Sequence, residues 1–132
     1  MKTIIILIIF TAIAFIEGCS DSSKNDKGVG PIKELSLGEI DQNMVKEGQE
    51  LFQKKCMTCH RLDQKLIGSA LRGITKKRTP EWIMNMMLNP DGMINENKAA
   101  RELFEDMKVR MNPKDVNEAD ARKILEYLRT EN

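Results

Sequence analysis

The chain of 132 residues has few aromatic side chains, one histidine and almost no net charge. Aromatic residues make up 5% of it, so Leu, Ile, Met or a group that the sequence does not encode must fill much of its core. Its 21 Lys and Arg nearly balance its 20 Asp and Glu, and the net charge of +1 gives no electrostatic reason to expect a nucleic-acid partner. The length suits one domain and is too short for two cores of ordinary size.

The longest apolar run covers residues 4–16, thirteen residues without a charge. A membrane-spanning helix needs about 20 apolar residues, so this run is typical of the central region of an export signal. Gly18 and Cys19 follow it, and a small residue before Cys at this position resembles the lipobox of bacterial lipoproteins. We therefore expect a signal peptide over residues 1–18 and a lipid on Cys19, which would hold the mature protein on the extracytoplasmic, periplasmic side of a membrane. A short uncleaved anchor and plain cleavage with release are the alternatives.

The rest of the chain divides into a polar segment and a helical one. Residues 19–39 are rich in turn-forming residues and show no sustained apolar period, which predicts a flexible, lipid-anchored tether. Residues 40–132 have the apolar spacing of helices and no strand-like alternation, so we expect one all-α domain. Capping and stop signals predict helices that end at Cys56, run from Pro80 to Asn89, follow Asn97, and run from about Asn117 to Thr130.

Residues 56–60 read Cys-Met-Thr-Cys-His. Two thiols at this spacing can each form a thioether to a haem vinyl group, while the imidazole of the next residue reaches the iron. Three alternatives fit less well. A thioredoxin-like pair needs a βαβ setting, a zinc site needs a fourth ligand and only the distant Cys19 remains, and a disulfide leaves His60 without a role. We therefore expect one covalent haem c on Cys56 and Cys59, with His60 as an axial iron ligand.

No second histidine can be the sixth iron ligand, which leaves Met, Lys, water or nothing. A thioether is a soft, neutral ligand that raises the reduction potential relative to a second histidine. We favour Met111, because Pro113 forbids helix and lets this segment cross the haem face as an extended loop. Met107 shares a helical stripe with apolar neighbours and is more typical of packing. Met93 and an open position are further alternatives.

In its motifs and their order, the chain resembles a small class I monohaem c-type cytochrome with His/Met ligation. The positions that carry the resemblance follow the order of that family, and they are Gly48, Phe52, Cys56 to His60, Gly68, Leu71, Gly73, Met111, Ile124 and Tyr127. The resemblance implies a cytochrome c fold in which the first and last helices cross at near right angles. It further implies that Gly48 and Phe52 meet Ile124 and Tyr127 at that crossing.

Two further positions are interpreted through this resemblance. The family usually has Pro directly after the glycine corresponding to Gly68, and its carbonyl accepts the N–H of the proximal histidine. Here the residue is Ser69, whose carbonyl can accept the same bond. Trp82 is similar to an indole of the family that donates to a haem propionate, and a core residue with its N–H at the surface is the alternative.

Charge is unevenly distributed along the predicted domain. Residues 40–80 contain nine Lys or Arg against four Asp or Glu, whereas residues 81–132 contain eight against eleven. In the family that the chain resembles, the exposed haem edge lies near the attachment segment. A basic docking rim for an acidic redox protein is therefore expected there, formed by Lys54, Lys55, Arg72, Lys76, Lys77 and Arg78.

The function implied is one-electron transfer by an iron-containing haem protein, not enzyme catalysis. The expected partners are a redox donor and a redox acceptor, such as respiratory membrane complexes, with the N-terminal lipid holding the protein near them. A haem-based sensor or gas-binding module with a labile sixth ligand is one alternative. A permanently docked haem subunit of a reductase or oxidase is another.

Overall fold

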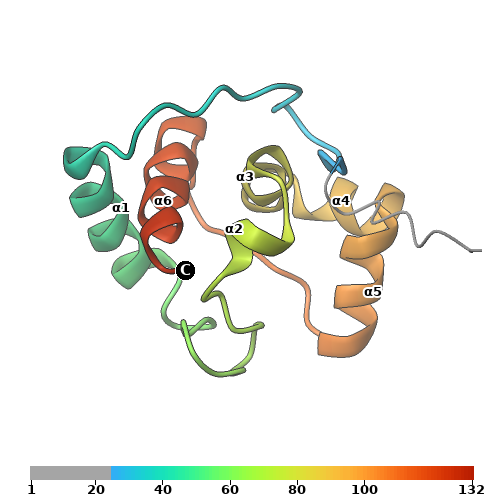
Figure 1. Cartoon of the computed structure of the whole chain (residues 1–132). Helices are drawn as coiled ribbons and strands as arrows, with labels where there is room; N and C mark the ends of the chain where they lie inside the picture. The colour runs from blue at the N-terminus through green and yellow to red at the C-terminus, as the bar shows by residue number, and fades with distance from the viewer. Residues whose placement is uncertain (1–24) are drawn as a thin grey trace, which may run out of the picture.

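A computed structural model describes residues 25–132, so the signal peptide predicted over residues 1–18 and the lipidation predicted at Cys19 lie outside the described residues. The described part is helical and contains no strand, which confirms the all-α prediction. Its helices, drawn in Figure 1, are α1 (Gln42–Lys55), α2 (Ile74–Lys77), α3 (Pro80–Leu88), α4 (Pro90–Glu96), α5 (Lys98–Met107) and α6 (Glu118–Thr130). Between residues 25 and 132, no helix combines the length and the apolar content that crossing a membrane requires.

Short polar side chains begin the helices where the sequence predicts them. The Thr79 hydroxyl accepts the Trp82 N–H at 3.2 Å before α3, and Asn97 accepts the Ala100 N–H at 3.0 Å before α5. Asn117 begins α6 in the same way. Each cap satisfies an amide that the first helical turn leaves without a partner.

Two helices were not predicted, the short α2 and α4. The sequence indicates a stop at Asn89 and Pro90, and α3 does end at Leu88. The chain nevertheless resumes at once as α4, because Pro90 occupies the first helical position, where no amide N–H is required. Asn89 then caps the new helix by accepting the Gly92 N–H.

The first and last helices pack against each other, as the resemblance implies (Figure 1). Gly48 and Phe52 are the buried residues of α1, and the Phe52 ring lies 5.4 Å from the ring of Tyr127, centroid to centroid. A Cβ at Gly48 would lie 2.0 Å from the carbonyl oxygen of Lys123, so the absence of a side chain permits this approach. The contact places the end of α1, and with it the first cysteine of the motif, against the core of the domain.

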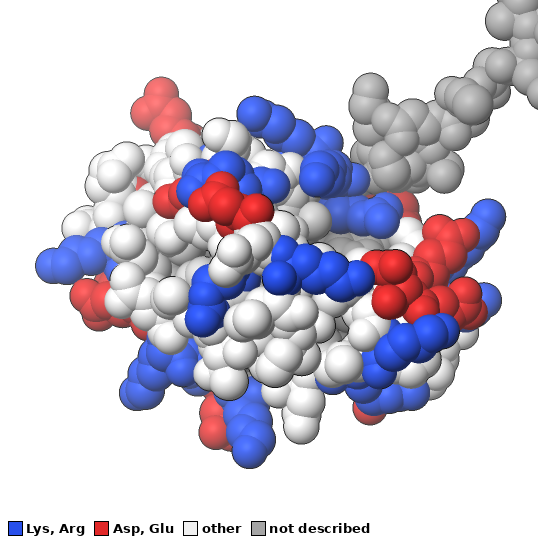
Figure 2. All heavy atoms as spheres, turned by 90° about the horizontal axis from the view of Figure 1, so that it is seen from below, with Lys and Arg blue, Asp and Glu red and all other residues white. Residues whose placement is uncertain are grey.

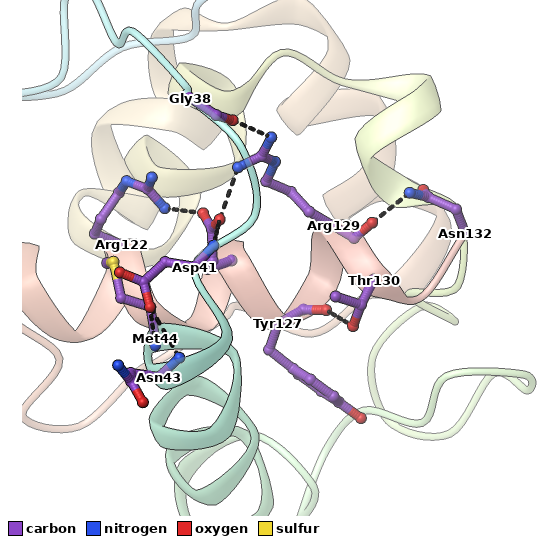
Figure 3. A network of polar contacts seen from close by, with 10 residues as sticks. Gly38, Asp41, Asn43, Met44, Arg122, Tyr127, Arg129, Thr130 and Asn132 are labelled. Carbon is purple, nitrogen blue, oxygen red and sulfur yellow. Dashed lines mark hydrogen bonds and ion pairs between the residues drawn. The ribbon is translucent and has the colours of Figure 1, made fainter.

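A buried carboxylate joins α6 to the start of α1. Glu126 is fully buried and accepts hydrogen bonds from the Asp41 N–H at 3.0 Å, from Arg129 at 2.8 Å and from Arg122. Figure 3 shows Arg122 and Arg129 on either side of Asp41, and Arg129 also donates to the Gly38 carbonyl at 2.9 Å. Burial alone would raise the pKa of Glu126, but the hydrogen bonds outweigh burial and lower it.

Residues 26–38 form an arm that runs along α3 and α4 (Figure 1). Ile32 is 6% exposed, and its backbone exchanges two hydrogen bonds with the buried side chain of Asn85, at 2.9 Å and 2.8 Å. The Leu35 N–H donates to Glu81 at 3.1 Å. The flexible tether predicted over residues 19–39 is therefore wrong for this part, because side chains of α3 satisfy the backbone of the arm and hold it on the domain.

Candidate haem site

The cysteine motif forms a tight turn at the end of α1. The Cys56 N–H closes the helix on the Phe52 carbonyl at 2.9 Å, and the amides of Cys59 and His60 both donate to the Cys56 carbonyl, at 3.0 Å and 2.9 Å. Both cysteines are half-buried, and neither is in a disulfide. The turn thus presents two free thiols and the imidazole of His60 within one compact segment.

The environment of Cys56 argues against a redox-active thiol pair. Desolvation by burial raises the pKa of the Cys56 thiol to about 11, against the opposing effect of Lys55. A catalytic thiol pair needs a lowered pKa so that a thiolate forms near neutral pH. Among the described residues, no group of three or more His, Cys, Asp and Glu side chains is placed to hold a metal ion.

The imidazole of His60 is fixed in both orientation and tautomer. Its Nδ1 lies 2.9 Å from the carbonyl oxygen of Ser69. Because a carbonyl can only accept, Nδ1 donates its N–H in this bond, and in the neutral ring the lone pair is then on Nε2. The bond expected from the Ser69 carbonyl is therefore present, and it prepares Nε2 to bind iron.

Gly68 provides the surface on which the imidazole lies. A Cβ at this position would be 2.4 Å from Cε1 and 2.7 Å from Nδ1 of His60, so any side chain would displace the ring. The Gly68 N–H donates to the Cys59 carbonyl at 2.7 Å. This bond holds the supporting loop, residues 61–72, against the cysteine motif. These contacts fit a haem c whose iron is bound by His60, because the chain supplies the two thiols and a ring already oriented for ligation.

Hydrogen bonds close the supporting loop although Ser69 replaces the usual proline. The Leu71 N–H donates to the Arg61 carbonyl at 3.1 Å, and the Arg72 N–H donates to the Leu62 carbonyl at 2.9 Å. The Arg72 side chain also joins Asp63 at the start of the loop to Glu131 beyond the end of α6. The hydrogen bond from Arg72 lowers the pKa of Asp63. Backbone pairing at the base of the loop thus provides rigidity that a proline would otherwise supply.

The methionines considered as sixth ligand lie in three different settings. Met111 is half-buried against the core and lies outside any helix, in the segment between α5 and α6. Met107 is the last residue of α5. Met93 is fully buried, and its sulfur accepts the Val29 N–H at 2.9 Å, so that this sulfur is already engaged. Met111 is therefore the methionine whose surroundings match the expected ligand loop.

Trp82 matches neither of its two expected settings. The residue is 4% exposed, and its indole N–H donates to the side-chain carbonyl of Asn97 at 3.2 Å. The Asn97 amide in turn donates to both carboxylate oxygens of Asp26, at 2.8 Å and 2.9 Å. The indole therefore helps to anchor the arm and donates neither to a propionate nor to solvent.

The predicted basic rim is partly neutralised. Figure 2 shows Lys and Arg side chains spread over the lower face of the molecule, with acidic side chains among them and uncharged surface between. Arg72 pairs with two carboxylates, and the guanidinium of Arg78 lies 4.8 Å from the centre of the Trp82 ring. Lys54, Lys76 and Lys77 are exposed.

Comparison with known proteins identifies the family of this chain. The family model for cytochrome c matches residues 45–132. The chain is similar to the solved cytochrome c from Rhodothermus marinus, with 43% identity over 83% of this chain and 94% of that chain and a TM-score of 0.75. An engineered form of that protein, solved with the carbene intermediate 1-ethoxy-1-oxopropan-2-ylidene, is 43% identical over 83% of this chain and 95% of that chain, with a TM-score of 0.72.

A shorter match connects the chain to a curated protein. It is 41% identical over 44 residues to cytochrome c2 from Rhodopseudomonas palustris (strain ATCC BAA-98 / CGA009), which corresponds to 33% of this chain and 31% of that protein. The match therefore spans about a third of the relative. Together with the oriented imidazole and the paired thiols, the family match shows that the chain belongs to the cytochrome c family, whose members carry one covalently bound haem c.

Proposed function

We propose that this protein is a one-electron carrier in which Cys56 and Cys59 hold haem c and His60 and Met111 are the iron ligands. The observation that carries the proposal is the orientation of His60, whose Nδ1 is bonded to the Ser69 carbonyl at 2.9 Å. This bond leaves Nε2 free for a metal and makes the imidazole a stronger donor. The haem, when bound, supplies an iron that changes between two oxidation states.

The chain must also provide the sixth iron ligand and hold it in place. A thioether is neutral and soft, and it raises the reduction potential relative to a second imidazole, which this chain lacks. The arm contributes by engaging the sulfur of Met93, so that this methionine does not compete with Met111. Ligation by His60 and Met111 leaves no open position for a substrate, which suits a carrier better than an enzyme.

The proposal includes an extracytoplasmic location and a lipid on Cys19. Because the arm is bound to the domain from Asp26 onward, only residues 20–25 would separate the lipidated cysteine from the folded part. A chain of this length spans at most about 25 Å, and about 15 Å on average if flexible. The domain would therefore stay close to the membrane, in reach of membrane complexes as donor or acceptor.

We also propose that an acidic surface of the redox partner meets the exposed lysines near the attachment segment. Lys54, Lys76 and Lys77 are exposed, and Met57 in the attachment motif and Ile67 after it are apolar residues that are 37% and 46% exposed. Such a surface favours fast and weak encounters over tight binding. The rate of electron exchange with a negatively charged partner should then fall as ionic strength rises.

Visible spectroscopy of the holoprotein tests the ligand assignment. Iron(III) bound by methionine gives a weak far-red absorption band, which we expect in the wild type and in Met107→Ala but not in Met111→Ala. We also expect no binding of carbon monoxide by the reduced wild type, because the sixth position is filled. Ready uptake of carbon monoxide would contradict the carrier and favour the sensor.

A further inference from the structure

One side chain joins the two ends of the supporting loop. At the end of the loop, Nε and Nη2 of Arg72 donate to the two carboxylate oxygens of Asp63, near its start, and the bond from Nη2 is 3.1 Å long. The backbone N–H of Arg72 donates to the Leu62 carbonyl at 2.9 Å. A guanidinium is a planar fork that matches a carboxylate in this two-bond arrangement, so Arg72 fixes how the two ends of the loop lie.

Arg72 also ties the loop to the last helix. Its Nη1 donates at 2.7 Å to the carboxylate of Glu131, the residue that follows α6. The backbone carbonyl of Glu131 accepts the N–H of Gly73 at 2.8 Å. Glu131 therefore holds two consecutive residues, one through its side chain and the other through its main chain. Because α6 packs against α1, the helix that leads into the cysteine motif, these bonds hold the loop in a fixed place relative to that motif.

The middle of the loop is less restrained. Residues 63–67 are exposed, and the ion pair between Lys65 and Asp106 joins side chains that are 57% and 70% exposed. A single exposed ion pair contributes little to stability. Arg72 is also partly exposed, but it binds two carboxylates at once, and bidentate pairs and networks are the exposed ion pairs that keep a measurable effect. The Arg72 contacts therefore restrain the loop more than the Lys65 pair does.

The restraint on the loop bears on His60 through Ser69. This residue lies three positions before Arg72, and its carbonyl accepts the Nδ1–H of His60 at 2.9 Å. Serine leaves the backbone dihedral φ free to vary, whereas proline would fix it. The Ser69 carbonyl thus stays in place only as far as the ends of the loop are held.

We propose that Arg72 is a positioning residue for His60. It acts through the loop, by holding the Ser69 carbonyl within reach of Nδ1. The inference rests on the proposed function, because it gives Arg72 a role toward an iron ligand. A hydrogen bond at Nδ1 makes Nε2 a stronger donor, and a stronger donor favours iron(III). Loosening the loop should therefore weaken this bond and raise the reduction potential.

The test replaces Arg72 by lysine, which keeps the charge and loses the planar fork. In reduced, isotope-labelled holoprotein, NMR measures how fast the Nδ1 proton of His60 exchanges with solvent, which requires its bond to Ser69 to open. We expect this exchange to be about five-fold faster in Arg72→Lys, the factor for one hydrogen bond of average net strength. Arg78→Lys is the matched control, because its guanidinium lies over the Trp82 ring and outside the loop, and it should exchange at the wild-type rate.

Two further measurements separate positioning from general stabilisation. The reduction potential should be higher in Arg72→Lys than in the wild type, and because the net charge is unchanged, this shift reports the ligand and not the local charge. Glu131→Gln leaves Arg72 in place and weakens its attachment to α6. This variant should also exchange the His60 ring proton faster than the wild type, so it provides the test if Arg72→Lys fails to accumulate as holoprotein.

The outcomes distinguish this inference from the proposed function. Exchange at the wild-type rate in Arg72→Lys would overturn the inference, even if the variant melts at a lower temperature, because the loop would then not control the bond. The ring protons of an axial ligand resonate far upfield in the reduced protein, since they lie over the haem plane. If His60 shows that shift and only the exchange rate is unchanged, ligation stands and the role of Arg72 fails. If His60 lacks the shift, the ligand assignment fails, and the role of Arg72 fails with it.

Discussion

The close approach of α1 to the backbone of α6 at Gly48 leads to a quantitative prediction for Gly48→Ala. A Cβ at this position would lie 2.0 Å from the carbonyl oxygen and 2.6 Å from the carbonyl carbon of Lys123, and 3.1 Å from the Cβ of Tyr127. The nearest atoms belong to the backbone of α6, so no side-chain rotation can relieve the overlap. The two helices must therefore separate by about 1 Å, which loosens the packing of the core that they share.

The expected loss of stability combines two opposing effects. Forcing an extra methyl group into a packed interface costs about 1 to 3 kcal/mol, and the rigid backbone places this case at about 3 kcal/mol. Replacing glycine by alanine within a helix stabilises the helix by about 1 kcal/mol, which offsets part of this cost. The net effect is a loss of about 2 kcal/mol in the free energy of unfolding, which corresponds to a fall of roughly 10 °C in the melting temperature of a domain this size.

Thermal unfolding of the oxidised holoprotein, followed by circular dichroism, measures this change. Gly38→Ala is the matched control, because a Cβ at Gly38 would meet no atom within 4 Å. This variant should melt at the wild-type temperature or slightly above it, since alanine restricts the unfolded chain. A Gly48→Ala protein that melts at or above the wild-type temperature would refute the packing argument.

Three other predictions concern the proximal ligand, the buried carboxylate and the arm. Gly68→Ala places a Cβ 2.4 Å from His60 and should shift the reduction potential in spectroelectrochemical titration; an unchanged potential would show that the ring does not rest on this residue. Because hydrogen bonds lower the folded-state pKa of Glu126 below its usual value of 4.5, ionised Glu126 stabilises the fold above that pH and the effect is lost as the pH falls below it. Glu126→Gln should therefore lose less unfolding free energy on acidification than the wild type in denaturant titrations, and equal losses would contradict this role. Asn85→Ala removes three hydrogen bonds to the arm, each of which contributes about 1 kcal/mol. Proteolysis within residues 26–38 should therefore be faster in this variant than in the wild type. Cleavage at the wild-type rate would mean that other contacts hold the arm.

The sequence predicted those parts of the fold that depend on local chemistry. The starts of α3, α5 and α6 follow from caps that bond to the amide three residues further on, so the signal and its effect lie in one short window. The start of α4 is equally local and was missed, because the sequence Asn89-Pro90 both ends one helix and begins the next. The haem motif is likewise contained in residues 56–60.

The arm and the setting of Trp82 depend on contacts between distant residues. Asn85 binds the backbone of Ile32 across 53 positions, and nothing in the polar sequence of residues 26–38 shows that an amide on α3 satisfies it. Asn97 is recognisable as a helix cap, but the sequence does not indicate that its oxygen also accepts the indole N–H. Side-chain amides with several partners are therefore where sequence-based prediction of this domain fails.

The most direct test of the account is to determine whether the protein holds haem covalently. The protein is purified from a host able to attach haem c, treated with acidified organic solvent that removes unattached haem, and weighed intact by mass spectrometry. We predict that the colour stays with the polypeptide and that its mass is that of the mature chain plus one haem, whereas Cys56→Ser with Cys59→Ser loses both. A colourless wild-type protein, or one whose pigment is extracted and whose mass is that of the polypeptide alone, would contradict the account.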